Sequence, residues 1–208
     1  MLHSPSAHPH PASWYDANAR DFFGQTVDLD TSEARARFMA RLPAAARVLD
    51  AGCGSGRDSL HFLRAGLDVD AVDASGEMVR LARRHTGLPV AHMDVLDMPP
   101  QGDYDGVWAM ASLIHLDVAL LPRALRVLGL TLRPGGVCLA SFRHGRNGYT
   151  RHGLRFNALD EKALEDILTG QDILEAAETW TRPDDRPGRP PWLYAIMSRA
   201  AGHRHNER

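Results

Sequence analysis

The chain has 208 residues, of which 44% are hydrophobic and 24% are charged, and its formal net charge at pH 7 is -2. This length and composition are typical of one soluble domain whose core needs no disulfide or metal. The charge argues against a nucleic-acid partner, and no apolar run approaches the roughly 18 residues of a membrane span. Cys53 and Cys138 lie in apolar segments, which favours a reducing, cytoplasmic location without disulfides.

Both ends of the chain are predicted to be disordered tails. Residues 1–12 alternate histidines with prolines, and residues 201–208 are polar, so neither segment has the periodicity of a helix or strand. The first segment also lacks the apolar stretch of a secretory signal. Its histidines have no thiol partner and no fixed spacing, so we expect no metal site.

Between the tails, short β-branched apolar runs alternate with longer amphipathic stretches. In chain order we expect helices over 13–23 and 31–41, a strand over 47–50, a helix over 57–65, a strand over 68–72, a helix over 75–85, strands over 89–93 and 104–109, a helix over 118–132, a strand over 137–142, a helix over 159–168, and strands over 173–181 and 192–198. Such alternation predicts right-handed βαβ units in a parallel sheet covered by helices on both faces.

The last two predicted strands differ from the others because no helical pattern separates them. A parallel crossover needs a dozen or more residues, so this pair is expected to form an antiparallel hairpin at the sheet edge. The fold class is therefore α/β, with a Rossmann-like, mostly parallel sheet of seven strands. Residues 13–200 should form a single domain.

A glycine-rich loop follows the first predicted strand. Residues 48–57 read Val-Leu-Asp-Ala-Gly-Cys-Gly-Ser-Gly-Arg, so Asp50 ends a buried strand and Gly52, Gly54 and Gly56 lead into a helix. Glycine is needed where the backbone adopts positive φ or where a ligand approaches the main chain. Open parallel sheets bind ligands at this edge. The loop predicts a ligand site, although such loops alone have low specificity.

Two more acids end the next two predicted strands, Asp73 after 69–72 and Asp94 after 90–93. The carboxyl ends of parallel strands meet at one edge, so both carboxylates should face the glycine loop. Asp73 lies twenty-three residues after Asp50, which suits hydrogen bonds to ribose hydroxyls. Asp94 could accept a hydrogen bond from an adenine amino group. Together they predict a nucleoside ligand.

The third glycine indicates which nucleoside. A dinucleotide loop reads Gly-x-Gly-x-x-Gly, whereas here Arg57 holds the last position and Gly56 comes one residue earlier. With the preceding aspartate, the run resembles the S-adenosylmethionine-binding motif of class I methyltransferases. The resemblance covers roughly residues 14–198 and includes both later acids and the Leu-Arg-Pro-Gly-Gly turn at 132–136. The chain also resembles the ubiquinone-pathway and tellurite-resistance subgroup, which methylates small molecules.

The resemblance implies a role for each residue. The glycine loop would pass beneath the methionine part of S-adenosylmethionine, Asp50 would orient its ammonium group, Asp73 would hold the ribose and Asp94 the adenine amine. Further implied contacts are Met93 and Val95 on the adenine, Ala109 and Met110 beside the methyl group, and Arg57 and Tyr15 on the carboxylate. Residues 13–42 would form the family's N-terminal helical lid, and S-adenosylhomocysteine would be the product.

Two histidines are candidate catalytic bases. Methyl transfer needs the acceptor aligned behind the methyl group and water excluded. A base is needed only where the acceptor carries a proton at neutral pH. His115 follows the fourth predicted strand and His144 follows the fifth, both at the carboxyl edge of the sheet. A histidine suits proton removal near pH 7. Alternatively, His115 caps or positions the following helix.

Arginine is unusually abundant, since only Lys162 among the 24 lysines and arginines is a lysine. Codon bias accounts for most of this, but seven arginines lie in the loops 143–155 and 182–189, at the edge where an acceptor would enter. Loops at such an edge usually carry function, and a guanidinium binds oxyanions through a planar fork. We expect a pocket for a small anionic or oxygen-rich acceptor, lined by Arg143, Arg155, Arg186 and Arg189.

Three other interpretations are open. A non-catalytic regulatory module would bind S-adenosylmethionine but have a featureless acceptor side. An NAD-dependent oxidoreductase would need the later third glycine and a Tyr/Lys pair, whereas Lys162 lies on a polar helix. A nucleic-acid methyltransferase would need a basic face or an Asn/Asp-Pro-Pro-Tyr/Phe motif, where residues 108–112 read Trp-Ala-Met-Ala-Ser. A cytoplasmic enzyme with a small-molecule acceptor, no nucleic acid and no membrane partner is the prediction.

Overall fold

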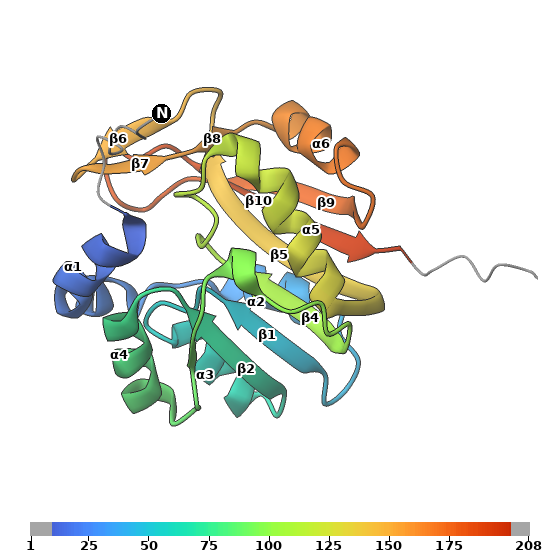
Figure 1. Cartoon of the computed structure of the whole chain (residues 1–208), viewed down its shortest axis with the longest axis horizontal. Coiled ribbons are helices and arrows are strands. Elements are labelled where there is room, and N and C mark those ends of the chain that lie inside the picture. Colours follow the sequence, from blue (N-terminus) through green and yellow to red (C-terminus); the bar gives the residue numbers. More distant parts are fainter. Residues whose placement is uncertain (1–9, 201–208) are drawn as a thin grey trace, which may run out of the picture.

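Seven strands follow one another across a single sheet in the order β3-β2-β1-β4-β5-β10-β9 in the computed structural model, which describes residues 10–200 (Figure 1). They are β1 (Arg47–Ala51), β2 (Asp68–Asp73), β3 (Ala91–His92), β4 (Tyr104–Ala109), β5 (Leu132–His144), β9 (Leu174–Arg182) and β10 (Trp192–Arg199). The first five pair in parallel, whereas β10 runs antiparallel to both of its neighbours, β5 and β9. This confirms the predicted fold class, and the short strand β8 (Ala158–Leu159) adds one further pairing to β5.

Helices cover both faces of the sheet, as the alternating pattern predicts (Figure 1). One face carries α5 (Leu121–Thr131) and α6 (Glu161–Thr169), and the other carries α2 (Ser32–Met39), α3 (Arg57–Arg64) and α4 (Gly76–Thr86). Successive side chains of a strand point to opposite faces. In β4, Val107 and Ala109 therefore pack toward α5, while Trp108 packs against Phe38 of α2 and Phe62 of α3.

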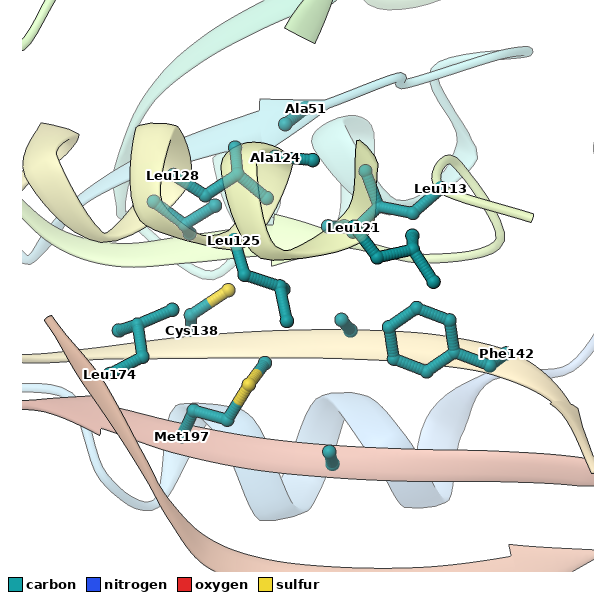
Figure 2. Packing of buried hydrophobic residues seen from close by; sticks show 14 of the residues in the cluster. Ala51, Leu113, Leu121, Ala124, Leu125, Leu128, Cys138, Phe142, Leu174 and Met197 are labelled. Atoms are coloured by element: carbon teal, nitrogen blue, oxygen red, sulfur yellow. The ribbon is translucent and has the colours of Figure 1, made fainter. Parts of the chain in front are cut away.

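The contact between α5 and the sheet shows how one helix is held. Leu121, Ala124, Leu125 and Leu128 recur at the three- and four-residue spacing of one helix face, and all four are fully buried. Figure 2 shows this face against Cys138 and Phe142 of β5 and Met197 of β10. Burying each leucine contributes roughly 1.5–3 kcal/mol. Packing of this face therefore holds α5 against β4, β5 and β10.

The helix expected over 75–85 begins with a serine, a favoured N-cap residue, and the structure confirms this cap. Ser75 is the N-cap, and its hydroxyl accepts a hydrogen bond from the Met78 N–H at 3.2 Å. Gly87 ends the helix with a φ of 77°. The helix expected over 31–41 also begins with a favoured N-cap residue, Thr31, but the Thr31 hydroxyl donates to Asp58 at 2.6 Å and makes no capping bond. The segment after β2 therefore leads directly into the capped start of α4.

Several boundaries differ from the predicted ones. The helix α1 (Pro11–Thr26) begins with a proline, which suits a first helical turn, so the last residues of the expected tail 1–12 are helical. Residues 1–9 and 201–208 lie outside the described residues. Residues 132–136, which we expected to form a turn, are the first residues of β5, and Gly135 among them has a φ of 80°. The sequence did not predict a hairpin of β6 (Tyr149–Arg151) and β7 (Leu154–Phe156).

Three further observations concern the described part of the chain. No helix within it has both the length and the apolar character that crossing a bilayer requires. Cys53 and Cys138 are both free and buried. In residues 10–200, no group of three or more His, Cys, Asp or Glu side chains has an arrangement suited to a metal ion.

Candidate active site

A cavity of about 710 Å³ lies at the carboxyl edge of the parallel strands. Its wall includes the glycine loop, the loops after β2, β3 and β4, one side of α1, and the β6–β7 hairpin. The ring centroids of Trp14 on α1 and His152 in the hairpin turn are 6.5 Å apart, so these two elements meet beside the cavity. The volume lies in the upper part of the range for small-ligand sites, roughly 300–1,000 Å³.

The glycine loop takes a conformation that side chains would prevent. Gly52 has a φ of 81°, and a Cβ on it would overlap the Ser112 Cβ. Gly56 has a φ of 76°, and a Cβ there would lie 2.6 Å from the Thr86 Cγ2. The loop therefore packs closely on the segment after β4 and on α4. Its middle glycine, Gly54, faces the cavity and donates its N–H to the Asp73 carboxylate at 2.8 Å.

Asp73 and Asp94 line the cavity as the sequence predicts. Each oxygen of the Asp73 carboxylate accepts one backbone N–H, Oδ2 from Gly54 and Oδ1 from Ser75 at 2.9 Å. Asp94 accepts from the Leu96 N–H at 2.8 Å. A carboxylate oxygen can accept a second bond, so both acids retain capacity for ligand hydroxyl or amino donors. Burial raises the pKa of Asp73, despite the two N–H bonds.

Asp50 is almost fully buried beneath the glycine loop, with 2% exposure. The Ser59 hydroxyl donates to its carboxylate at 2.5 Å. Burial, together with the negative charge of Asp58, raises the pKa of Asp50 from 3.8 to about 7. A buried carboxylate with one such partner favours a ligand that brings positive charge or donors.

Asp58 is the second buried acid of this region, and its surroundings shift its pKa in the opposite direction to that of Asp50. Burial alone would raise its pKa, but its hydrogen bonds and charge contacts, those of Arg57 foremost, hold the pKa below the usual value. Four side chains donate to it: Arg57, Thr31, Arg35 and Trp108. Arg57 also donates to the Thr26 carbonyl at 3.2 Å. This cluster joins the end of α1 to α2, α3 and β4.

Tyr15 and His115 are joined by a hydrogen bond of 2.8 Å between the phenol oxygen and Nε2. The His115 Nδ1 lies 2.8 Å from the Arg155 carbonyl oxygen, which can only accept, so Nδ1 carries the proton and Nε2 accepts from Tyr15. Burial lowers the pKa of His115 and raises that of Tyr15. The pair is thus a neutral imidazole and a protonated phenol. The predicted contact of Tyr15 with a cofactor carboxylate would require this bond to open.

The other half of the cavity is basic. Arg143, at the end of β5, is buried and donates from Nη1 to the Asp184 carboxylate at 2.7 Å and to the Pro190 carbonyl at 3.1 Å. Arg186 donates to both oxygens of Asp184 at 2.8 Å. These bonds to Arg186 and Arg143 hold the pKa of Asp184 far below its usual value, although burial opposes them. Arg189 also lines this half.

Five predicted site residues do not line the cavity, and one of them is Gly56, which packs on α4 instead. Ala109 faces α5 in the core, and Met93 contacts the same core from β3. The His144 Nε2 lies 3.2 Å from Glu161. Arg155 is exposed on the outer side of the hairpin. By contrast, the cavity wall includes residues that sequence reasoning did not assign to the site: Arg151, His152, Phe156, Asp184 and Trp192.

The fold and the site define a class of protein. Carboxylates at the ends of β1, β2 and β3 surround the glycine loop, while the apolar side chains of Met78, Val95 and Leu96 line the same part of the cavity. A dinucleotide would place a diphosphate beside these acids, which is electrostatically unfavourable. A cationic nucleoside fits the acids and the apolar wall. The chain is therefore a Rossmann-like protein with a site for a positively charged nucleoside.

Comparison with known proteins supports this class. Residues 48–136 match a family model described as "Methyltransferase domain". Malonyl-[acyl-carrier protein] O-methyltransferase of Enterobacter lignolyticus is 34% identical over 143 residues, which cover 67% of this chain and 56% of the relative. Ubiquinone biosynthesis O-methyltransferase of Xanthomonas axonopodis pv. citri is 41% identical over 106 residues, which cover 47% of this chain and 43% of the relative.

A solved structure of similar fold is 1,6-didemethyltoxoflavin-N1-methyltransferase of Burkholderia thailandensis, with bound 1,6-didemethyltoxoflavin and S-adenosylhomocysteine. It is 25% identical, with a TM-score of 0.75 over 96% of this chain and 93% of that one. The chain belongs to the class I S-adenosylmethionine-dependent methyltransferases. It spans about half the length of the curated relatives it matches. The predicted likeness to ubiquinone-pathway enzymes is confirmed, whereas that to tellurite-resistance enzymes stays a prediction.

Proposed function

We propose that the chain transfers a methyl group from S-adenosylmethionine to a small anionic acceptor. The observation that carries this proposal is the division of the cavity into two halves of opposite charge. Asp50, Asp73 and Asp94 line one half, whereas Arg143 and Arg189 line the other. A cationic cofactor and an anionic acceptor would each find a complementary environment.

The acidic half would hold the cofactor. Asp73 has free acceptor capacity on both oxygens for ribose hydroxyls, and Asp94 has it for the adenine amine. Asp50 would face the ammonium group, whose charge favours the ionised form of this acid. Arg57 also lines the cavity and lies at the start of α3, where a helix N-terminus favours a carboxylate. Val95 and Met110 would supply apolar contacts.

When bound, S-adenosylmethionine supplies a methyl group on a sulfonium, and the new bond forms from the acceptor to the methyl carbon while the carbon–sulfur pair stays on sulfur. The protein's task is to align the acceptor and exclude water. A hydroxyl acceptor must also lose a proton. The acceptor hydroxyl would donate to the Tyr15 oxygen as Tyr15 passes its own proton to the His115 Nε2, leaving an imidazolium. His115 is then the base and Tyr15 the relay.

Calorimetry with S-adenosylhomocysteine and with NAD tests the cofactor assignment. We expect S-adenosylhomocysteine to bind in the micromolar range or tighter and NAD not to bind. A methyl-transfer screen over phenols, thiols, small acids and tellurite then tests the acceptor class. Replacing Arg143 and Arg189 by methionine should raise the acceptor KM and leave cofactor affinity unchanged. NAD binding without S-adenosylhomocysteine binding would overturn the proposal.

A further inference from the structure

Arg143 is held rigidly at the wall of the basic half. Its side chain is only 3% exposed, and its Nη1 is engaged by Asp184 and by the Pro190 carbonyl. The guanidinium carbon lies 3.5 Å from the centroid of the Trp192 ring, a cation–π contact that covers one face. Both the plane and the rotation of this guanidinium are therefore fixed before any ligand binds.

One edge of this guanidinium has no partner. The Nε–H is buried and meets no acceptor among residues 10–200, and Nη2 forms no hydrogen bond within the same part of the chain. Burying an unpaired donor costs about 1–3 kcal/mol, and more on a charged group. Nε and Nη2 together form the fork that receives both oxygens of a carboxylate. The unsatisfied edge thus matches a missing bidentate anion.

The positive charges around Arg143 are only partly balanced by nearby carboxylates. The single carboxylate of Asp184 is shared by Arg143 and Arg186. Arg189 forms no ion pair with any described residue, and burial and the charges of Arg186 and Arg151 lower its pKa. Two carboxylates, Asp184 and Asp185, face five arginines in this wall, at positions 143, 151, 182, 186 and 189, so a further negative charge is favoured.

The shape of this half favours a flat molecule. The cavity wall includes the aromatic side chains of Trp14, Phe156 and Trp192. Phe156 is itself stacked on Tyr149 at 4.9 Å with an interplanar angle of 3°, which fixes its ring. Planar conjugated ligands stack favourably on such faces.

The presence of His115 indicates that the acceptor group that is methylated differs from the carboxylate that Arg143 would bind. An ionised carboxylate has no proton to lose, so methylating it needs no base. His115, however, is neutral and held with Nε2 as an acceptor. His115 and Arg143 both line the cavity, and the His115 ring centroid lies 4.5 Å from that of Phe156 in the basic half. A base near the anion site indicates that the methylated atom bears a proton and is distinct from the carboxylate.

We infer that Arg143 binds the carboxylate of a planar hydroxy acid through Nε and Nη2, with the acceptor hydroxyl directed to Tyr15 and His115. This inference rests on the proposed function, because it assigns the acceptor to the basic half. The carboxylate is an anchor, and the product is a methyl ether that retains a free acid. Arg189 supplies a second positive charge to the same anchor.

Calorimetry on the protein loaded with S-adenosylhomocysteine tests the anchor without turnover. The probes are 4-hydroxybenzoate, benzoate and 4-hydroxybenzamide. We expect both carboxylates to bind and the amide to bind at least about tenfold more weakly, because charge-assisted hydrogen bonds are lost. Absence of carboxylate binding at millimolar concentration, or equal binding of the amide, overturns the inference. Failure of S-adenosylhomocysteine to bind would instead overturn the proposed function.

Two variants and a matched control locate the anchor. Arg143→Lys keeps the charge beside Asp184 but loses the fork, and should weaken benzoate binding at least about tenfold. Arg189→Gln removes a charge that has no ion pair among the described residues, so the variant should fold normally. It should also weaken benzoate binding, because the second positive charge near the carboxylate is lost. Arg146→Lys, at a side chain 86% exposed and outside the cavity wall, should change nothing. Unaltered benzoate binding in both Arg143→Lys and Arg189→Gln overturns the inference.

The methylated product gives an independent readout. A methyl ether survives alkaline hydrolysis, whereas a methyl ester is cleaved. Mass spectrometry of the product from hydroxybenzoates, before and after alkali, should find the methyl group retained. An alkali-labile product would show that the carboxylate is the acceptor and would overturn its role as the anchor.

Discussion

Replacing Asp50 by asparagine should stabilise the protein, and more so at higher pH. Raising the pKa of the buried carboxyl from 3.8 to about 7 costs up to about 4 kcal/mol once the group is ionised, at about 1.4 kcal/mol per pH unit. Below pH 3.8 both the folded and the unfolded state are protonated, and the cost is absent. Between pH 3.8 and 7 the unfolded state loses the proton while the folded state retains it, so wild-type stability falls as pH rises.

Asparagine has nearly the same shape, and its carbonyl oxygen can still accept from the Ser59 hydroxyl. We expect the advantage of Asp50→Asn over wild type to grow by about 2–3 kcal/mol between pH 5 and pH 8. In a chain of this size that corresponds to about 5–10 °C in the difference of Tm. Urea unfolding and thermal melts over this pH range, without ligand, measure it. The decisive quantity is how the stability difference between Asp50→Asn and wild type changes with pH, because the effect of a lost hydrogen bond alone would not change with pH.

Asp58 offers a control of opposite sign. Its folded-state pKa is lowered, so its contribution to stability is present above its unfolded pKa and is lost as the pH falls through the lower folded value. Asp58→Asn should therefore be less stable than wild type at pH 7, by about 2–4 kcal/mol. If Asp50→Asn shows no pH-dependent gain, or if both variants respond alike, the assignment of the two environments is wrong.

Three further substitutions test separate parts of the site. Tyr15→Phe removes the donor to the neutral His115 Nε2, so the pKa of His115 should rise, as followed by NMR; an unchanged titration would contradict the observed bond. Gly52→Ala places a Cβ onto Ser112 at a positive φ and should cost about 2–4 kcal/mol in urea unfolding, whereas wild-type stability would refute the close packing. His144→Gln should leave S-adenosylhomocysteine and benzoate affinity within about twofold, since its partner is Glu161 outside the cavity wall; a tenfold loss would return His144 to the site.

The cofactor half was predictable because each of its features is local in the chain. Asp50, the glycine loop and Asp73 lie at strand ends, and parallel strands bring their carboxyl ends to one edge without further information. The capping of α4 by Ser75 needed only a few neighbouring residues. Met93 and Ala109 are the exceptions in this half, because their side chains pack into the core instead of facing the cavity.

The errors in the acceptor half come from side-chain alternation. Arg143 and His144 are adjacent on β5, and successive side chains of a strand point to opposite faces. Only one of the two can therefore face the cavity. In the hairpin, Arg151 lies opposite Leu154 and Arg155 lies opposite Thr150, which puts the two arginines on opposite faces. This register depends on a His-Gly turn with positive φ at both residues, which is a weaker hairpin signal than Asn-Gly.

Long-range contacts were beyond the sequence altogether. Tyr15 and His115 are separated by 100 residues, and Arg143 and Asp184 by 41. No local pattern indicates that a phenol will meet an imidazole or that one aspartate will be shared by two arginines. These pairs depend on how α1 and the loop before β10 pack at the carboxyl edge of the sheet.

The position of β10 between β5 and β9 has a consequence for biosynthesis. As the chain leaves the ribosome, the acids of the cofactor half emerge with β1 to β3, well before the arginines of residues 143–189. In the sheet, β9 pairs only with β10, so it has no partner until the later strand is made and inserted. Nascent chains that lack β10 should therefore be able to assemble the nucleoside-binding half while the acceptor half is still open.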